Sequence, residues 1–209
     1  MEPDKIFDSL KEKIIWLDIA PETILNLSEL SDEFGSSRTP VKEALIALQA
    51  EGWVMRHGSK FMVTPLSLNR IKEITEIRSI LEVQATIWAM LRINQQGVEQ
   101  LETIIEEANA LGDPASIRDV VMLDFKYHRA IYRATGNIQL MNFLDMLLSQ
   151  YLRFWLAMQT DIDPHNFFTE HVELTEAINS RDESSVRAVS ARHIKTSVDA
   201  IKRAFLEHI

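Results

Sequence analysis

The chain contains no cysteine among its 209 residues. Disulfides and thiolate metal sites are therefore excluded, and any metal ion must be bound by histidine, aspartate or glutamate. Long hydrophobic runs are also missing, since charged residues interrupt every apolar stretch well short of the ~20 residues that a membrane span needs. The N-terminal segment lacks the basic start and unbroken apolar core of a secretory signal. We therefore expect a cytoplasmic protein without a membrane partner.

Positive charge is scarce, because 22 lysines and arginines face 31 aspartates and glutamates and give a net charge of −9. Its distribution matters more than its sum. Residues 35–66 hold four cations against two anions, which are Arg38, Lys42, Arg56 and Lys60 against Glu43 and Glu51. A small basic region in an otherwise acidic chain fits a protein that contacts DNA at one place only.

The first 66 residues change pattern quickly, as expected for a small domain of mixed elements. The apolar spacing and the positions of Pro21, Pro40 and Gly52 predict three helices followed by two short strands. Their expected ranges are Lys5–Leu17, Ser28–Phe34, Ser37–Ala50, Trp53–Arg56 and Phe61–Val63. This order predicts a winged helix-turn-helix domain over residues 1–66, with the two strands as its β-hairpin wing.

Residues 67–209 show a helical period almost throughout, and Thr64–Ser67 is the expected linker. The predicted helices lie near 68–93, 96–111, 115–134, 138–158, 166–180 and 183–207. Six helices joined by short loops predict an all-α antiparallel bundle. The expected fold class is therefore mainly α, with a winged N-terminal domain and a helical C-terminal domain.

The third predicted helix offers a DNA-reading face. Its apolar residues repeat on one side, whereas Arg38 and Lys42 lie one turn apart on another, where an arginine can bind guanine in the major groove. Basic residues at this spacing also occur on ordinary solvated helix faces, so the pattern alone leaves both interpretations open. The complete set of expected DNA contacts is Ser37, Arg38, Thr39 and Lys42 on the helix, and Arg56, His57, Gly58 and Lys60 on the wing.

Polar residues occupy positions on the predicted inward faces of the bundle. Asp124 and His128 are one turn apart on one helix, while His171, His193 and Arg78 lie on three others. A buried histidine often needs only a backbone carbonyl as its partner. Several imidazoles and a carboxylate that converge between helices can instead hold a divalent cation. From the pattern alone, a cation site and a set of hydrogen-bonded core histidines remain open.

Two longer stretches resemble a known family. The run Gly35–Leu45, followed by Leu48–Val54, is similar to the recognition-helix signature of the GntR family of bacterial regulators, although Lys42 stands where that family commonly has arginine. Residues 68–209 resemble the FCD effector domain of its FadR-type branch. This resemblance implies a metal site formed by Asp124, His128, His171 and His193, and an effector contact from Arg78 in a segment that also contains Glu82.

The expected function is transcriptional repression. One small winged domain reads too few bases, so we expect a homodimer on a near-palindromic operator. Our hypothesis is that the operator is released when a small organic acid binds at or near the metal. Zinc is the expected ion, with nickel or manganese as alternatives. Two other hypotheses are a metalloenzyme that uses the same Asp/His3 site, and a regulator whose metal is purely structural. No general base stands out beside the four residues, and Glu170 is the nearest in sequence.

Overall fold

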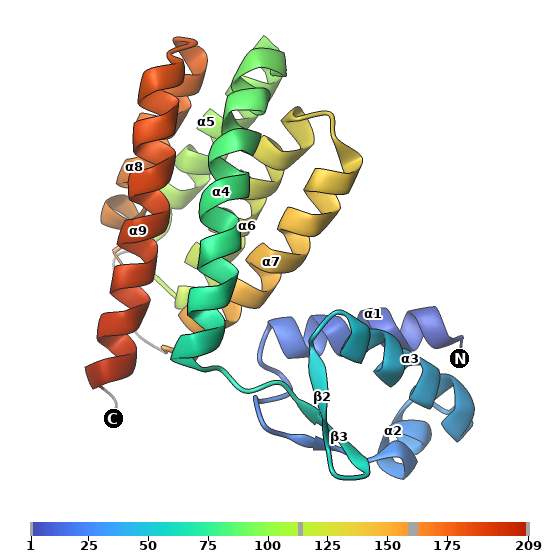
Figure 1. Ribbon diagram of the computed structural model, residues 1–209. Helices are drawn as coiled ribbons and strands as arrows, with labels where there is room; N and C mark the ends of the chain where they lie inside the picture. Colours follow the sequence, from blue (N-terminus) through green and yellow to red (C-terminus); the bar gives the residue numbers. More distant parts are fainter. Residues whose placement is uncertain (1, 113–114, 159–162, 208–209) are drawn as a thin grey trace. The chain divides into compact units, whose positions relative to one another are not determined.

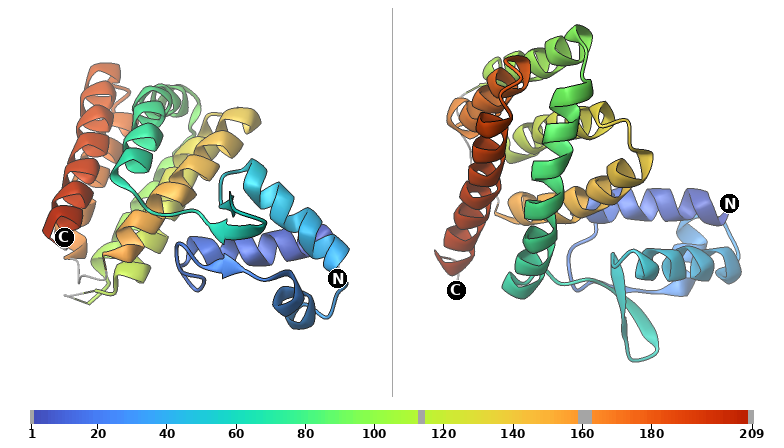
Figure 2. Two further views of the ribbon diagram at one scale, coloured as in Figure 1. Left: turned by 60° about the horizontal axis from the view of Figure 1, so that its bottom comes forward. Right: turned by 45° about the horizontal axis from the view of Figure 1, so that its top comes forward.

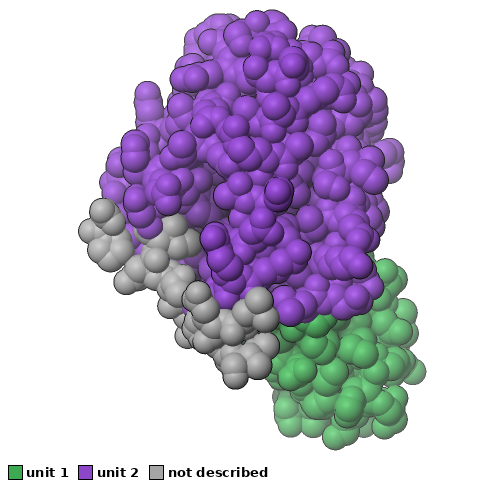
Figure 3. Space-filling model, turned by 60° about the vertical axis from the view of Figure 1, so that its left-hand side comes forward, with its two compact units in different colours: residues 1–67 green, residues 68–209 purple. Residues whose placement is uncertain are grey.

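The computed structural model describes residues 2–112, 115–158 and 163–207. The chain divides into two compact units, residues 1–67 and 68–209 (Figure 3). The N-terminal unit contains α1 (Pro3–Ile15), β1 (Ile24–Leu25), α2 (Leu27–Glu33), α3 (Arg38–Ala50), β2 (Val54–His57) and β3 (Lys60–Val63). The C-terminal unit contains α4 (Leu68–Arg92), α5 (Gln95–Asn109), α6 (Ile117–Ala134), α7 (Ile138–Ala157), α8 (Pro164–Asn179) and α9 (Glu183–Glu207).

The N-terminal unit has its own hydrophobic core. Helix α1 buries one stripe of side chains at four-residue spacing, and α3 buries a face that does not carry its basic residues. Trp53 and Phe61 of the hairpin region are fully buried against these helices. The buried residues of the two helices are Ile6, Leu10 and Ile14 on α1 and Val41, Ala44, Leu45 and Leu48 on α3. This packing leaves the opposite face of α3 exposed to solvent.

The wing is an antiparallel hairpin in a small sheet with the strand order β1-β3-β2. Val54 pairs with Val63 and His57 with Lys60, so the turn lies at Gly58-Ser59. Gly58 adopts a φ of 60°, a left-handed conformation that glycine tolerates without strain. Strand β1 was not expected from the sequence, because its two residues are too short to show a period of two.

The C-terminal unit is built only of helices within the part of the chain that the structure describes. Helix α4 packs against α9, α6 and α7, while α5 packs against α6 and α8 (Figures 1 and 2). Asparagine or aspartate side chains cap the starts of α5, α7 and α8 by accepting backbone N–H bonds. None of the described helices is long and apolar enough to cross a membrane.

Gly97 belongs to the capped start of α5. It lies in the first turn of α5, where its N–H donates to the Asn94 side chain at 2.9 Å. A Cβ at this position would lie 2.5 Å from Cγ1 of Ile93. The glycine therefore permits close packing at the helix start and does not interrupt the helix.

Candidate metal centre and nucleic-acid interface

Four side chains from three helices converge inside the C-terminal unit. Asp124 and His128 lie one turn apart on α6, His171 on α8 and His193 on α9. One ligand atom from each lies within 4.8 Å of all the others. Asp124, His128 and His171 are buried and His193 is half-buried. The structure thus brings together the four residues that the sequence singled out as metal ligands.

The ligand atoms of the four side chains lie within hydrogen-bonding range of one another or close to it. Nε2 of His171 lies 2.8 Å from Oδ1 of Asp124, and Nε2 of His128 lies 3.5 Å from the same oxygen. Nε2 of His193 faces Nε2 of His128 at 3.2 Å. An N–H of one neutral imidazole can donate to the lone pair of the other, and a cation held between two lone pairs would satisfy both nitrogens as well.

The protonation states of His171 and Asp124 also fit a cation. Burial lowers the pKa of His171 to about 4, although Asp124 raises it in part, so this ring is neutral at pH 7. Burial raises the pKa of Asp124, but the charge of His128 and the hydrogen bonds from the histidines outweigh it and hold that pKa well below its usual value. Neutral imidazole and ionised carboxylate are the forms that bind metal. Three nitrogens and one oxygen are a donor set that suits a divalent transition metal.

Glu170 supports the cluster from outside, and the sequence did not single it out for this role. Its Oε2 lies 3.2 Å from Nδ1 of His193, and this hydrogen bond is the main reason that the pKa of Glu170 is lowered. Its Oε1 accepts hydrogen bonds from Arg192 and Thr196 at 3.1 Å each. A carboxylate on Nδ1 fixes the tautomer of an imidazole and leaves Nε2 free to bind metal.

We expect Glu170→Gln to weaken zinc binding by about 10–100-fold, the usual effect of losing such a supporting carboxylate. Competition with a fluorescent zinc chelator measures this affinity. Glu173→Gln is the matched control, because Glu173 pairs with Arg192 and no contact joins it to His193 among the described residues. Equal zinc affinity in the two variants would show that Glu170 does not position His193.

Arg78 is buried on α4, but its charge is already balanced. Its Nε and Nη2 donate to Oε1 and Oε2 of Glu82 at 2.7 and 3.1 Å, and its guanidinium lies 4.1 Å from the centre of the Tyr151 ring. Glu82 also accepts a hydrogen bond from Tyr132 of α6, whose ring lies 6.1 Å from that of His128. Arg78 therefore belongs to a network that joins α4 to the helix carrying Asp124 and His128.

Arg78→Ala should destabilise the protein by about 3–5 kcal/mol, because it leaves the Glu82 carboxylate buried without its counter-charge. Urea unfolding followed by circular dichroism gives this free energy. The double variant Arg78→Ala/Glu82→Gln should recover part of the loss, since it removes the stranded charge. A single variant as stable as the wild type would contradict this description of the pair.

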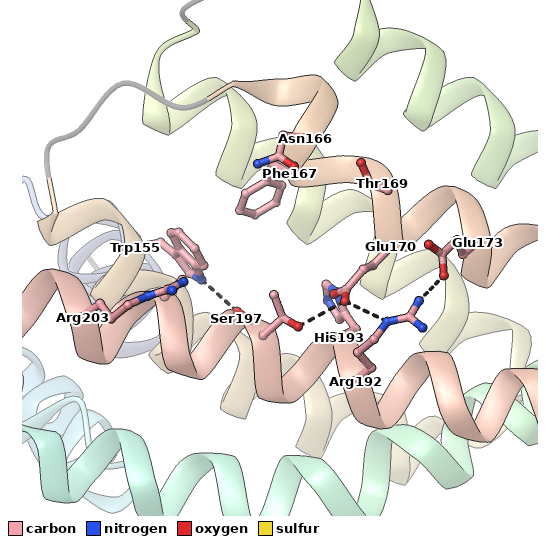
Figure 4. Close-up of a pocket in the computed structure, with 12 residues that line it drawn as sticks. Trp155, Asn166, Phe167, Thr169, Glu170, Glu173, Arg192, His193, Ser197 and Arg203 are labelled. Carbon is pink, nitrogen blue, oxygen red and sulfur yellow. Dashed lines mark hydrogen bonds and ion pairs between the residues drawn. The ribbon is translucent and has the colours of Figure 1, made fainter.

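A cavity of about 410 Å³ adjoins the cluster. It is lined by residues from the end of α7, from α8 and from α9, and His193 forms part of its wall (Figure 4). Glu170 and Arg192 lie at the His193 end, whereas Trp155 and Arg203 lie further along. His193 therefore belongs both to the four-residue cluster and to the wall of a cavity large enough for a small organic molecule.

The residues expected to contact DNA are displayed on the N-terminal unit. On α3, Arg38, Thr39 and Lys42 are exposed, and the exposed Ser37 is its N-cap residue. Nη2 of Arg38 donates to Oγ of Ser28 on α2 at 2.7 Å, which orients the guanidinium at the helix start. On the wing, the exposed residues are Arg56, His57, Gly58 and Lys60. The guanidinium of Arg56 lies 3.8 Å from the centre of the Phe61 ring.

A winged helix-turn-helix followed by a helical domain with a buried His/Asp cluster defines the class of two-part bacterial DNA-binding regulators. Residues 3–60 match the gntR family of bacterial regulatory proteins, and residues 73–196 match the FCD domain. The FCD match alone covers more than half of the chain. The protein belongs to the GntR family, with an FCD domain as its helical part, which confirms the resemblance and the fold expected from the sequence.

Known proteins similar to this chain are also regulators. The Nta operon transcriptional regulator of Aminobacter aminovorans is 27% identical over 184 residues, which cover 87% of this chain and 85% of that protein. The transcriptional repressor RspR of Escherichia coli K12 is 22% identical over 201 residues, and the alignment covers 95% of this chain and 88% of RspR. Among solved structures, E. coli McbR/YncC has a TM-score of 0.83 at 19% identity, over 97% of this chain and 98% of its own.

These comparisons decide between two of the hypotheses. The relatives are transcriptional regulators, and the shared domains are a DNA-binding domain and an effector domain. The chain is therefore a transcriptional regulator and not a metalloenzyme.

Proposed function

We propose that this protein is a metal-dependent repressor whose affinity for its operator falls when a small carboxylic acid binds beside the metal. The observation that carries the proposal is the double position of His193, in the Asp124/His128/His171 cluster and in the wall of the 410 Å³ cavity. A molecule in the cavity can thus contact a residue of the metal centre directly. The E. coli relative RspR is named a repressor, which supports repression as the direction of regulation.

Zinc is the proposed ion, with nickel or manganese as alternatives, held by Asp124, His128, His171 and His193. Such an ion would supply positive charge in a site from which bulk water is largely excluded. It would also tie α6, α8 and α9 together, because each of these helices contributes a ligand. A purely structural metal is the competing hypothesis, and the operator experiment below separates the two.

Arg78 has a different proposed role from the direct effector contact that the sequence suggested. Arg78 does not line the cavity, and its positive charge is balanced by Glu82. The Arg78–Glu82–Tyr132 network instead connects α6 to α4, the first helix after the winged unit in the chain. We propose that Arg78 transmits a ligand-induced shift of α6 to α4, and that the operator affinity changes as a consequence.

A homodimer is proposed because one small winged domain reads too few bases for specific binding, whereas two domains read a near-palindrome. Helix α4 carries an apolar stripe opposite its buried face. Ile77, Ile80 and Leu91 are 42%, 72% and 63% exposed, and a helical period places them within one narrow sector. We propose that the same stripe of a second copy covers these side chains.

We expect Ile80→Glu to shift the protein from dimer to monomer, because it places a charge in the proposed apolar contact. Analytical ultracentrifugation measures the mass directly. Met122→Glu makes the same kind of change at a 36% exposed position on α6, and this variant should stay dimeric. An unchanged dimer in Ile80→Glu would rule out this face of α4 as the contact.

Operator titrations test the regulatory proposal. The operator is first selected from random DNA with the zinc-loaded protein, and its affinity is then measured with zinc-loaded and metal-stripped protein, each with and without a panel of organic acids. We expect one class of acid to weaken operator binding by about 5–150-fold, the usual range of allosteric coupling, and only with zinc present. If the metal strengthens binding but no acid changes it, the structural-metal hypothesis holds instead.

A further inference from the structure

The cavity beside His193 has an aromatic corner. The rings of Trp155 and Phe167 meet at 5.2 Å between centroids with an interplanar angle of 77°. Trp155 is held in place because its Nε1 donates to Oγ of Ser197 at 3.2 Å, and the Phe167 ring lies 5.4 Å from that of Phe168. Aromatic faces and edges fixed in this way favour a flat, apolar partner.

The hydroxyl groups that line the cavity are already engaged. Oγ of Ser197 bonds to Trp155 and, at 2.6 Å, to the hydroxyl of Tyr151. Thr196 donates to Glu170 and Thr169 donates to the backbone oxygen of His165, both at 3.1 Å. A ligand with many hydroxyl groups would find few open partners here, and burying unpaired hydroxyls is costly.

The charged groups give the cavity two unlike ends. Near His193, Arg192 is neutralised by ion pairs with Glu170 and Glu173. At the other end, Arg203 makes no ion pair with any residue that the structure describes, although its side chain lines the cavity beside Trp155 (Figure 4). Arg203 follows His193 by ten positions on α9, a rise of about 15 Å. Of the two arginines that line the cavity, Arg203 is therefore the one available to an anionic group.

We propose that this cavity binds a planar aromatic monocarboxylic acid, with its carboxylate on Arg203 and its ring against Trp155 and Phe167. The volume of about 410 Å³ lies in the lower part of the range for small-molecule sites, which suits a ligand of one or two rings. A substituent on the ring would extend along the cavity wall in the direction of His193. The binding site is inferred from the residues of the cavity alone, whereas the ligand's role as effector rests on the proposed function.

Calorimetric titration of the zinc-loaded full-length protein tests the site. The probes are trans-cinnamate, its neutral amide and gluconate, a polyhydroxy acid without a ring. We expect trans-cinnamate to bind at least about tenfold more tightly than the other two, since only it offers both the ring and the charge. Arg203→Gln should lower its affinity about tenfold, whereas Lys202→Gln, at the exposed neighbouring position outside the cavity, should leave it unchanged.

Three results would overturn the proposal: equal affinities in Arg203→Gln and Lys202→Gln, gluconate or the amide binding as tightly as trans-cinnamate, or no saturable binding of trans-cinnamate. Operator titrations on the same samples keep the two proposals apart. Arg203-dependent binding that leaves operator affinity unchanged supports the site and refutes the effector role. An operator response to trans-cinnamate that is identical in Arg203→Gln supports regulation by an acid and refutes this site.

Discussion

Removing the metal is expected to lower the melting temperature of the full-length protein on the order of 10 °C. Free zinc at about a thousand times its dissociation constant contributes about 4 kcal/mol, and 1 kcal/mol corresponds to about 2–4 °C for a chain of this size. The physical reason is that Asp124, His128 and His171 are buried and would face one another without their common partner. Differential scanning calorimetry with chelator, and after adding back zinc, nickel or manganese, measures the shift and its recovery.

Histidine variants give this experiment its controls. His128→Ala and His193→Ala should each abolish the response to chelator, because each removes one of the four ligands. His165→Ala should keep the full response, since His165 is exposed in the first turn of α8 and is not part of the cluster. Identical melting with and without chelator in the wild type would leave these side chains as ordinary core histidines.

Arg38→Ala is expected to abolish specific operator binding, at a cost of roughly 1–3 kcal/mol or more. The guanidinium lies at the start of α3, where a recognition helix meets the base edges, and its hydrogen bond to Ser28 fixes its direction. Gel-shift titrations at one fixed salt concentration measure the affinity, because the phosphate contribution varies steeply with salt. The melting temperature should not change, since the side chain is exposed.

Lys42→Arg is the informative companion to Arg38→Ala. Lys42 is exposed on the same helix one turn later, and arginine can bind guanine through two nitrogens where lysine offers one. The variant should therefore bind the operator as well as the wild type or better. An unchanged affinity in Arg38→Ala would refute the assignment of α3 as the recognition helix.

Most of the fold could be predicted because apolar periodicity depends on nearby residues only. The helices of both units and the hairpin wing follow from it, and the comparisons confirm the fold class. The errors occurred where local signals are weak. The predicted helix near 166–180 leaves His165 in a loop, but His165 lies in the first turn of α8, because Asp163 caps a helix that begins at Pro164, two residues before the predicted start. His208, expected from the sequence as an ordinary surface residue near the C-terminus, lies outside the described residues.

The candidate site was predictable only in part. Asp124 and His128 share one helix face, so their proximity follows from a four-residue spacing, and His171 and His193 follow from their inward positions. Glu170 reaches His193 from another helix, so this contact depends on side-chain directions across the packed bundle and does not follow from sequence spacing. The pairing of Arg78 with Glu82 does follow from spacing, since the two lie four residues apart on one helix. That the four residues bind metal stays a prediction.

The metal content of the purified protein tests the central claim most directly. Elemental analysis after extensive dialysis against metal-free buffer should find about one divalent ion per chain in the wild type and in His165→Ala. It should find almost none in His128→Ala or His193→Ala. A wild-type protein that is free of metal, and that takes up no zinc when zinc is offered, would contradict the proposed metal-dependent regulation.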